Sequence, residues 1–226
     1  RAGDGQVRIL VGSYDGYLYC LEALTGRPIW SYKTGSYING SPAIVQDRCI
    51  IGGCDSLVHM ISVPDGNAIG TVESGSYIAG SVAVRDEHAY VGNYAGDLLK
   101  ISVEDGRIVW RNSLGDVPIL SCPAIWKDVL VFGARDKRLH CLDLGTGKEI
   151  WSFLTMGNVD CSPVICDGKV IFGSDDGRLY VVSLDNGRLL WSYQVGKPIV
   201  GGPAVGYGVV VTGSEDGNVY AFGHLE

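Results

Sequence analysis

A unit of about forty residues repeats along almost the whole chain and limits the fold more than any other feature. One glycine marks the repeat at steps of 40 or 41 residues, at positions 12, 52, 92, 133, 173 and 213. A tryptophan keeps the same register at positions 30, 110, 151 and 191, whereas the second repeat has Gly70 in its place. A period of 40–45 residues built from short strands is typical of a β-propeller.

Each repeat contains four short apolar runs separated by turn residues. In the fifth repeat the runs cover 162–166, 169–172, 178–183 and 188–194, with Asp-Gly and Asn-Gly in the turns between them. These dipeptides supply the positive φ angles that tight hairpins need. The sequence therefore predicts an all-β chain of four-stranded antiparallel blades, with strands named A to D from the propeller axis outward.

The repeat predicts six blades in one domain that covers residues 1–226. Their predicted limits are 7–35, 41–75, 81–115, 121–156, 162–196 and 202–224. The first blade lacks strand A and the last lacks strand D. Open strand edges promote aggregation, so we expect the chain to be part of a larger ring, completed by upstream blades or by a partner segment.

Composition excludes some kinds of partner. The chain has 226 residues, 46% of them hydrophobic, and a net charge of −7 without a Lys/Arg run, so we expect no nucleic-acid partner. No stretch is apolar over the roughly 18 residues that a membrane span needs. The seven cysteines are an odd number, which disfavours a complete disulfide framework and favours a reducing compartment, the cytoplasm. We expect most of them to be packing residues.

Two stretches carry a family resemblance. The sequence LGTGKEIW at 144–151 and the sequence CSPVICDGKVIFGSDDG at 161–177 resemble the two halves of the PQQ-like repeat. The resemblance covers residues 7–224, and the subgroup that the chain most resembles is the bacterial BamB-like one. It implies an eight-bladed ring with two to three blades before Arg1, a role in protein assembly, and a place in the bacterial envelope or periplasm.

The name of the repeat does not imply a cofactor. Quinoproteins of this fold use calcium, a catalytic Asp and often adjacent cysteines, whereas this chain has no adjacent cysteines and no Asp-rich calcium loop. We predict no cofactor, no metal and no catalytic residue. One tryptophan is not explained by the repeat: Trp126 takes the place of Ile44, Val84 and Ile165 in strand A, and we expect it to pack in the core.

Most chemically capable side chains occupy regular positions of the repeat. His59 and His140 share a position that elsewhere holds tyrosine or leucine, so we expect a structural role for both. Turn aspartates recur at 15, 55, 136, 176 and 216, and we expect each to bond to its own turn backbone.

The links between strand D and the next strand A vary most. They lie on the same face as the B–C turns, and we name this surface the link face. Exposed aromatic and polar groups there are typical of a protein or glycan site. The predicted partner-binding residues are Tyr37, Tyr77, Asp116, Asn158, Asp160 and Lys197.

These features favour a non-catalytic interaction scaffold. Two alternatives stay open. One is the ligand-sensing domain of a larger signalling protein. The other is a quinoprotein-type redox enzyme with its essential residues on missing blades.

Overall fold

The computed structural model describes residues 7–223, and the ends of the predicted domain, 1–6 and 224–226, lie outside the described residues. The chain forms two compact units, which divide after Asp116. We call them unit 1 and unit 2 and describe each by itself.

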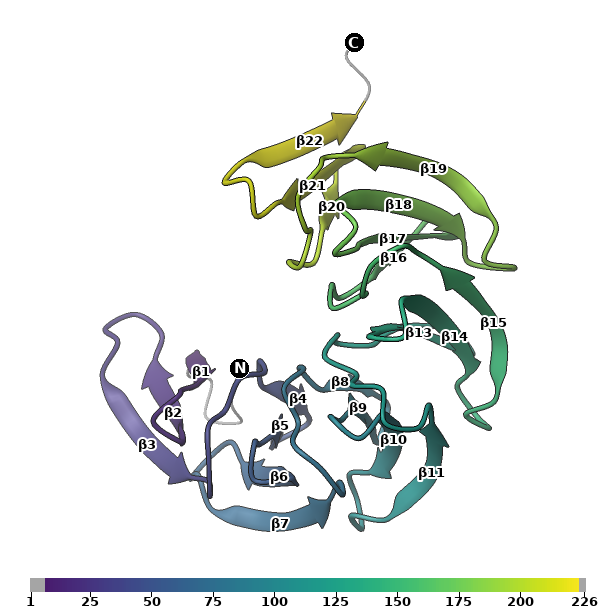
Figure 1. Ribbon diagram of the computed structural model, residues 1–226. Coiled ribbons are helices and arrows are strands. Elements are labelled where there is room, and N and C mark those ends of the chain that lie inside the picture. The colour runs from purple at the N-terminus through teal and green to yellow at the C-terminus, as the bar shows by residue number, and fades with distance from the viewer. Residues whose placement is uncertain (1–6, 224–226) are drawn as a thin grey trace. The chain divides into compact units, whose positions relative to one another are not determined.

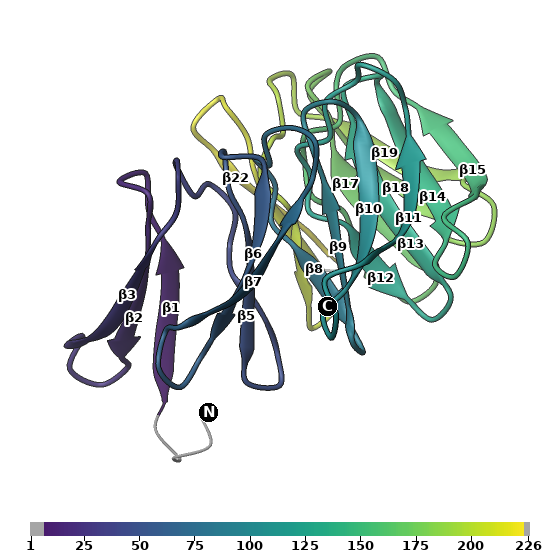
Figure 2. The same cartoon turned by 90° about the horizontal axis from the view of Figure 1, so that it is seen from below.

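Unit 1 contains three antiparallel sheets, which are blades 1 to 3 (Figure 1). Blade 1 is the three-stranded sheet β1-β2-β3, and blades 2 and 3 are the four-stranded sheets β4-β5-β6-β7 and β8-β9-β10-β11. Figure 2 shows the sheets of blades 1 and 2 side by side. The strands are β1 (Arg8–Gly12), β2 (Tyr17–Glu22), β3 (Pro28–Lys33), β4 (Ala43–Val45), β5 (Arg48–Gly52), β6 (Leu57–Ser62), β7 (Ala68–Glu73), β8 (Ala83–Arg85), β9 (His88–Gly92), β10 (Asp97–Ser102) and β11 (Ile108–Ser113).

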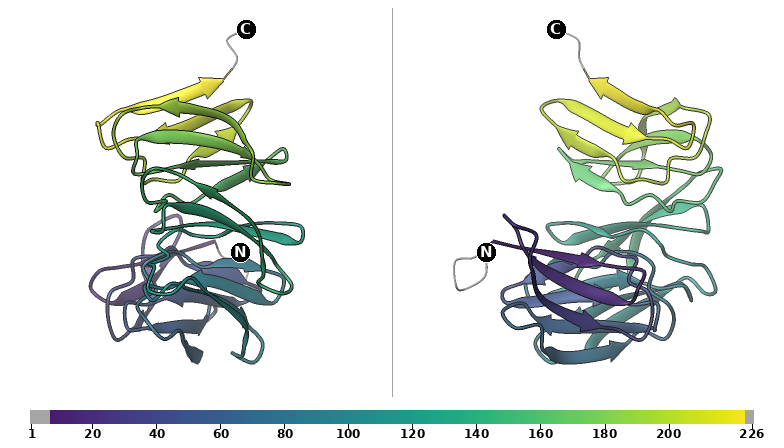
Figure 3. Two further views of the ribbon diagram at one scale, coloured as in Figure 1. Left: turned by 45° about the vertical axis from the view of Figure 1, so that its right-hand side comes forward. Right: turned by 90° about the vertical axis from the view of Figure 1, so that its left-hand side faces the viewer.

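Unit 2 contains blades 4 to 6 in the same arrangement. Blades 4 and 5 are β12-β13-β14-β15 and β16-β17-β18-β19, and blade 6 is the three-stranded sheet β20-β21-β22. Figure 3 shows the yellow sheet of blade 6 stacked on the green sheet of blade 5. The strands are β12 (Ala124–Trp126), β13 (Val129–Ala134), β14 (Arg138–Asp143), β15 (Glu149–Leu154), β16 (Val164–Cys166), β17 (Lys169–Gly173), β18 (Arg178–Ser183), β19 (Leu189–Gln194), β20 (Ala204–Gly206), β21 (Val209–Gly213) and β22 (Val219–Gly223).

The blade pattern agrees with the sequence prediction. Among residues 7–223 there are six antiparallel sheets and no helix, and the first and last sheets have three strands each. The first described strand is a B strand and the last is a C strand, as predicted.

The glycine that marks the repeat makes room for the link between blades. In blade 2, a Cβ added to Gly52 at the end of β5 would lie 2.2 Å from Cγ2 of Ile78. In blade 5, Gly173 and Ile199 stand in the same relation, again at 2.2 Å. Ile78 and Ile199 are fully buried. Any side chain at the glycine position would therefore clash with the buried link residue and force it to move.

The tryptophan of strand D joins one blade to the next. The indole N–H of Trp30 donates to the Val63 carbonyl at 3.0 Å, and that of Trp151 donates to the Leu184 carbonyl at 2.9 Å. Each acceptor lies 33 residues downstream, in the following blade. The indole thus bridges the gap between blades at both positions.

Trp191 differs from this pattern. It is 41% exposed and packs against Phe222 of blade 6, with ring centroids 5.3 Å apart. Its ring is therefore less buried than those of Trp30 and Trp151.

Candidate functional site

The turn aspartates do more than the predicted backbone bonding. Asp176 accepts from the backbone N–H of Arg178 at 3.0 Å and from the Tyr180 hydroxyl at 2.8 Å. The same carboxylate–ring pair, four residues apart, occurs in blades 1, 2, 4 and 6, as Asp15–Tyr19, Asp55–His59, Asp136–His140 and Asp216–Tyr220. Blade 3 lacks both partners at once, since Ala95 and the fully buried Leu99 replace them. The pair is thus a structural unit of the blade.

His140 is the most strongly enclosed of these rings. Its Nε2 lies 3.0 Å from Asp136, its Nδ1 lies 2.6 Å from Glu149, and its ring stacks on Phe132. Burial on its own lowers the pKa of His140, but hydrogen bonds to the two carboxylates and their negative charge outweigh burial and raise it. The two carboxylates therefore favour the charged form of the His140 ring.

His59 has one carboxylate where His140 has two. Its Nε2 lies 3.1 Å from Asp55, and its Nδ1 lies 3.1 Å from the hydroxyl of Tyr32 in the preceding blade. Both histidines are only 3% exposed. His140 joins strands within blade 4 and His59 joins blade 2 to blade 1, as the prediction of a structural role requires.

The link face of unit 1 carries tyrosines in pairs. Tyr37 and Tyr77, from two successive links, are 55% and 59% exposed. Tyr37 contacts Tyr14 with ring centroids 5.5 Å apart, and Tyr77 contacts Tyr94 at 6.3 Å. The sequence analysis missed Tyr14 and Tyr94, although they occupy one repeat position in the B–C turns, 80 residues apart. We call these four residues the tyrosine set.

The link face of unit 2 carries charges instead. Asp160 forms an ion pair with Arg135, whose Nη2 lies 2.8 Å away. The pKa of Asp175 is raised by burial and by the negative charges of Asp160 and Glu215. Arg135 and Asp175 occupy the repeat position that holds Tyr14 and Tyr94 in unit 1.

The remaining predicted site residues play smaller parts. The Asn158 carbonyl accepts from the backbone N–H of Asp175 at 2.9 Å, and the Lys197 carbonyl accepts from the Ser214 hydroxyl at 3.2 Å. The side chain of Lys197 is exposed, and so is Asp116 at the end of unit 1. The two predicted tyrosines thus lie in unit 1 together with Asp116 at its end, and the remaining polar and charged residues lie in unit 2.

The described residues form no cluster of metal ligands, and several of their cysteine thiols are buried and unreactive. Within residues 7–223, no three His, Cys, Asp or Glu side chains gather into a possible metal site. Burial raises the pKa of Cys49, Cys141 and Cys161 to about 12. Such thiols stay protonated at neutral pH and resist oxidation in any compartment. Free cysteines of this kind do not distinguish cytoplasm from envelope.

No described helix is both long and apolar enough to cross a membrane. The architecture of successive four-stranded antiparallel blades defines the chain as a β-propeller protein.

The chain belongs to the family described as outer membrane protein assembly factor BamB, whose model matches residues 54–225. This confirms the resemblance to PQQ-like, BamB-like repeats. Among solved structures, the chain is similar to BamB from Moraxella catarrhalis, with a TM-score of 0.82 and 20% sequence identity. That match covers 96% of this chain and 70% of the other. No curated protein is significantly similar in sequence.

Proposed function

We propose that this protein is a non-catalytic scaffold that holds a segment of a partner protein on the link face of unit 1. The observation that carries the proposal is the tyrosine set. Four tyrosines that are 40–69% exposed stand in two pairs, one at the junction of blades 1 and 2 and one at the junction of blades 2 and 3. Tyrosine is enriched among the residues that dominate binding energy, because its ring offers a large contact area and its hydroxyl a hydrogen bond.

The links that carry these rings are held firmly. The Thr34 hydroxyl lies 2.9 Å from the Gly16 carbonyl oxygen and 2.6 Å from that of Ser36. The Ser74 hydroxyl holds the next link in the same way, through Ser56 and Ser76. A surface that is ordered before binding loses less conformational entropy when a partner docks.

The family supports the kind of process. Its model is described as an outer membrane protein assembly factor, so we propose a role in the assembly of envelope proteins and a periplasmic location. Protonated, buried thiols such as Cys49 are compatible with that location.

Photocrosslinking in the native host tests the proposal. Benzoylphenylalanine placed at Tyr37 or at Tyr77 should crosslink to one common protein on irradiation. Benzoylphenylalanine at Leu24, which is 93% exposed in the C–D turn of blade 1, is the matched control and should not. Equal crosslinking from Leu24, or crosslinks from Tyr37 and Tyr77 only to glycan, would contradict a protein site on the link face.

The double variant Tyr37→Ala, Tyr77→Ala completes the test. It should lose capture of the crosslinked partner while its melting curve stays nearly unchanged, because both rings are more than half exposed. Capture that survives the substitutions would show that the tyrosines do not form the site.

A further inference from the structure

Trp126 lies at the edge of an open groove between blades 4 and 5. It is 51% exposed, so the expectation that it packs in the core is wrong. It is the last residue of its strand and pairs with Val129, as Val45 pairs with Arg48 in blade 2. Trp126 therefore occupies the repeat position of Val45, Arg85 and Cys166. This is one position later than the sequence analysis assigned to it. The groove has a volume of about 600 Å³.

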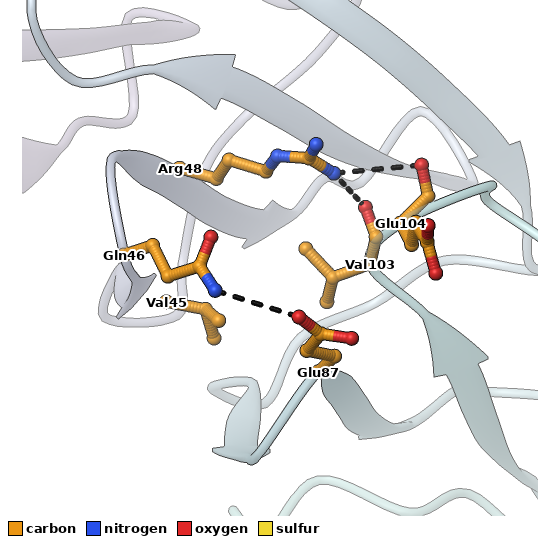
Figure 4. A pocket seen from close by; sticks show the side chains of 6 residues that line it. All are labelled: Val45, Gln46, Arg48, Glu87, Val103 and Glu104. Atoms are coloured by element: carbon orange, nitrogen blue, oxygen red, sulfur yellow. Dashed lines mark hydrogen bonds between the residues drawn. The ribbon is translucent and has the colours of Figure 1, made fainter.

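The corresponding place in unit 1 is filled by an arginine. At the junction of blades 2 and 3, Arg48 donates to the carbonyl oxygens of Val103 and Glu104 (Figure 4). The space left beside it has a volume of about 160 Å³. At the junction of blades 1 and 2, Arg8 donates to the Val63 and Pro64 carbonyls at 2.9 and 2.8 Å. Each arginine bridges two blades through a pair of adjacent carbonyls.

Blade 4 has no arginine at this repeat position. The residue at the start of its B strand is Val129, which cannot donate a hydrogen bond. The repeat equivalents of the two acceptor carbonyls belong to Leu184 and Asp185, and both residues line the groove. Cys141 also lines it and corresponds to Cys20, which hydrogen-bonds to Arg8. The groove therefore lies at the position that a guanidinium group fills at the junctions of unit 1.

The acceptors in the groove can serve an incoming donor. The Leu184 carbonyl accepts from the Trp151 indole, as the Val63 carbonyl accepts from Trp30. The Val63 carbonyl accepts from Arg8 as well, so this carbonyl position accommodates two donors. A carbonyl oxygen has two lone pairs, which explains the double use.

The charge and aromatic content of the groove favour a cation. Asp128, Asp167 and Asp185 line it with Lys127 as the only lining cation among the described residues, although Lys169 pairs with Asp167 at 2.6 Å. Two indoles, those of Trp126 and Trp151, add aromatic faces that attract a cation.

We propose that this groove binds an arginine side chain of a partner polypeptide. The partner guanidinium takes the place that Arg8 and Arg48 occupy in unit 1, donates to the Leu184 and Asp185 carbonyls, and lies against Trp126. The groove opens beside the A–B and C–D turns, so this contact is separate from the tyrosine set and does not depend on the proposed function.

A short peptide tests the chemistry directly. Acetyl-Gly-Arg-Gly-amide is titrated into the 226-residue chain, and the indole N–H signal of Trp126 is followed by NMR. The matched peptide contains citrulline, which keeps the shape and removes the charge. The arginine peptide should bind at least tenfold more tightly and weaken as salt is added. Equal binding of the citrulline peptide would overturn the proposal.

A substitution tests the position. Val129→Arg supplies the guanidinium within the chain, as blades 1 and 2 do, and should reduce peptide binding at least tenfold without lowering the melting temperature. The control is Val209→Arg, at the same repeat position in blade 6, and it should leave binding unchanged. A folded Val129→Arg protein that binds the peptide as before would overturn the proposal.

A second variant covers the case in which Val129→Arg does not fold. Trp126→Ala removes a half-exposed ring and should weaken peptide binding several-fold. Unchanged binding by this variant would overturn the proposal as well.

Discussion

The junction of blades 2 and 3 and the junction of blades 4 and 5 close the same gap with different side chains. In blade 4, Trp151 covers the gap, and a Cβ on Gly187 of the next blade would lie 2.6 Å from its ring. In blade 2, Gly70 replaces the tryptophan, and the methyl group of Met60 lies 3.5 Å from where a Cβ on Gly70 would stand. The same methyl group would lie 3.3 Å from a Cβ added to Gly106 of blade 3.

The polar contacts differ in the same way. The Val103 carbonyl takes a hydrogen bond from Arg48, whereas the equivalent Leu184 carbonyl takes one from the indole of Trp151. The first junction combines a flexible thioether with an arginine, and the second combines an indole with an open groove. One repeat position can therefore lose its usual residue when another side chain fills the volume and the carbonyl keeps one donor.

The largest expected effect concerns the indole junction. Trp151→Ala should cost about 3–5 kcal/mol of unfolding free energy, because it leaves a cavity between blades and an unpaired carbonyl. Urea denaturation followed by circular dichroism measures the loss. Trp191→Ala is the comparison and should cost only about 1–2 kcal/mol, since its ring is 41% exposed. A loss below about 1 kcal/mol for Trp151→Ala would mean that the indole does not close the gap.

The glycine beneath the indole gives the next effect. Gly187 has a φ of 68°, and Gly26 has a φ of 70° in the same turn of blade 1 with no atom within 4 Å of an added Cβ. Gly26→Ala should therefore cost only the left-handed backbone, about 1–2 kcal/mol. Gly187→Ala should cost about 2–4 kcal/mol, because the indole must also move. Equal losses in the two variants would show that the contact with Trp151 is not tight.

The arginine of the other junction comes third. Arg48→Met keeps most of the aliphatic packing and removes the bonds to Val103 and Glu104, at a cost of about 1.5–3 kcal/mol. Arg178→Met, on strand C of blade 5, is the control and should cost less, because its Nη1 contacts only the Ser192 hydroxyl at a long 3.4 Å. If Arg48→Met loses no more stability than the control, the hydrogen bonds of Arg48 do not stabilise the junction.

The smallest effect distinguishes His140 from His59 by pH. The pKa of His140 is raised in the folded protein, so its charged contacts add stability that is complete below the unfolded pKa of about 6.5 and is lost as pH rises through the folded value. Glu149→Gln should therefore destabilise the protein by up to about 1 kcal/mol near pH 6 and by less near pH 9. Glu73→Gln, on the exposed edge of blade 2, should show no such trend. A Glu149→Gln difference that is constant with pH would mean that Glu149 does not hold the charged ring.

Much of this architecture could be predicted because a repeated pattern averages over local ambiguity. Six copies of one glycine position fixed the strand order, and the strand limits of blade 5 agree with the prediction to within two residues. Strand A is the exception, because the sequence placed Trp126 one repeat position too early. It is only three residues long, so its alternation is too short to set the register.

The contacts between positions were harder to predict, although traces of them are present in the sequence. The aspartate and the ring four residues later disappear together at Ala95 and Leu99, which is the mark of a direct contact. Arginine likewise stands at 8 and 48, at the two junctions that it bridges, whereas the same repeat position holds His88, Val129, Lys169 and Val209. The sequence could not predict which groups accept these hydrogen bonds, because the acceptors are backbone carbonyls and every residue has one. The tyrosine set and the predicted charged residues remain a proposed site.

The bond from each indole to a carbonyl 33 residues downstream also bears on the order of folding. These contacts join only neighbouring blades, so they raise the contact order less than pairing between distant parts of the chain would. During synthesis on the ribosome, the indole of one blade can form this hydrogen bond as soon as the C strand of the next blade has emerged. We therefore expect nascent chains to gain protease resistance in steps of one repeat, with no delay for the last residue of the polypeptide.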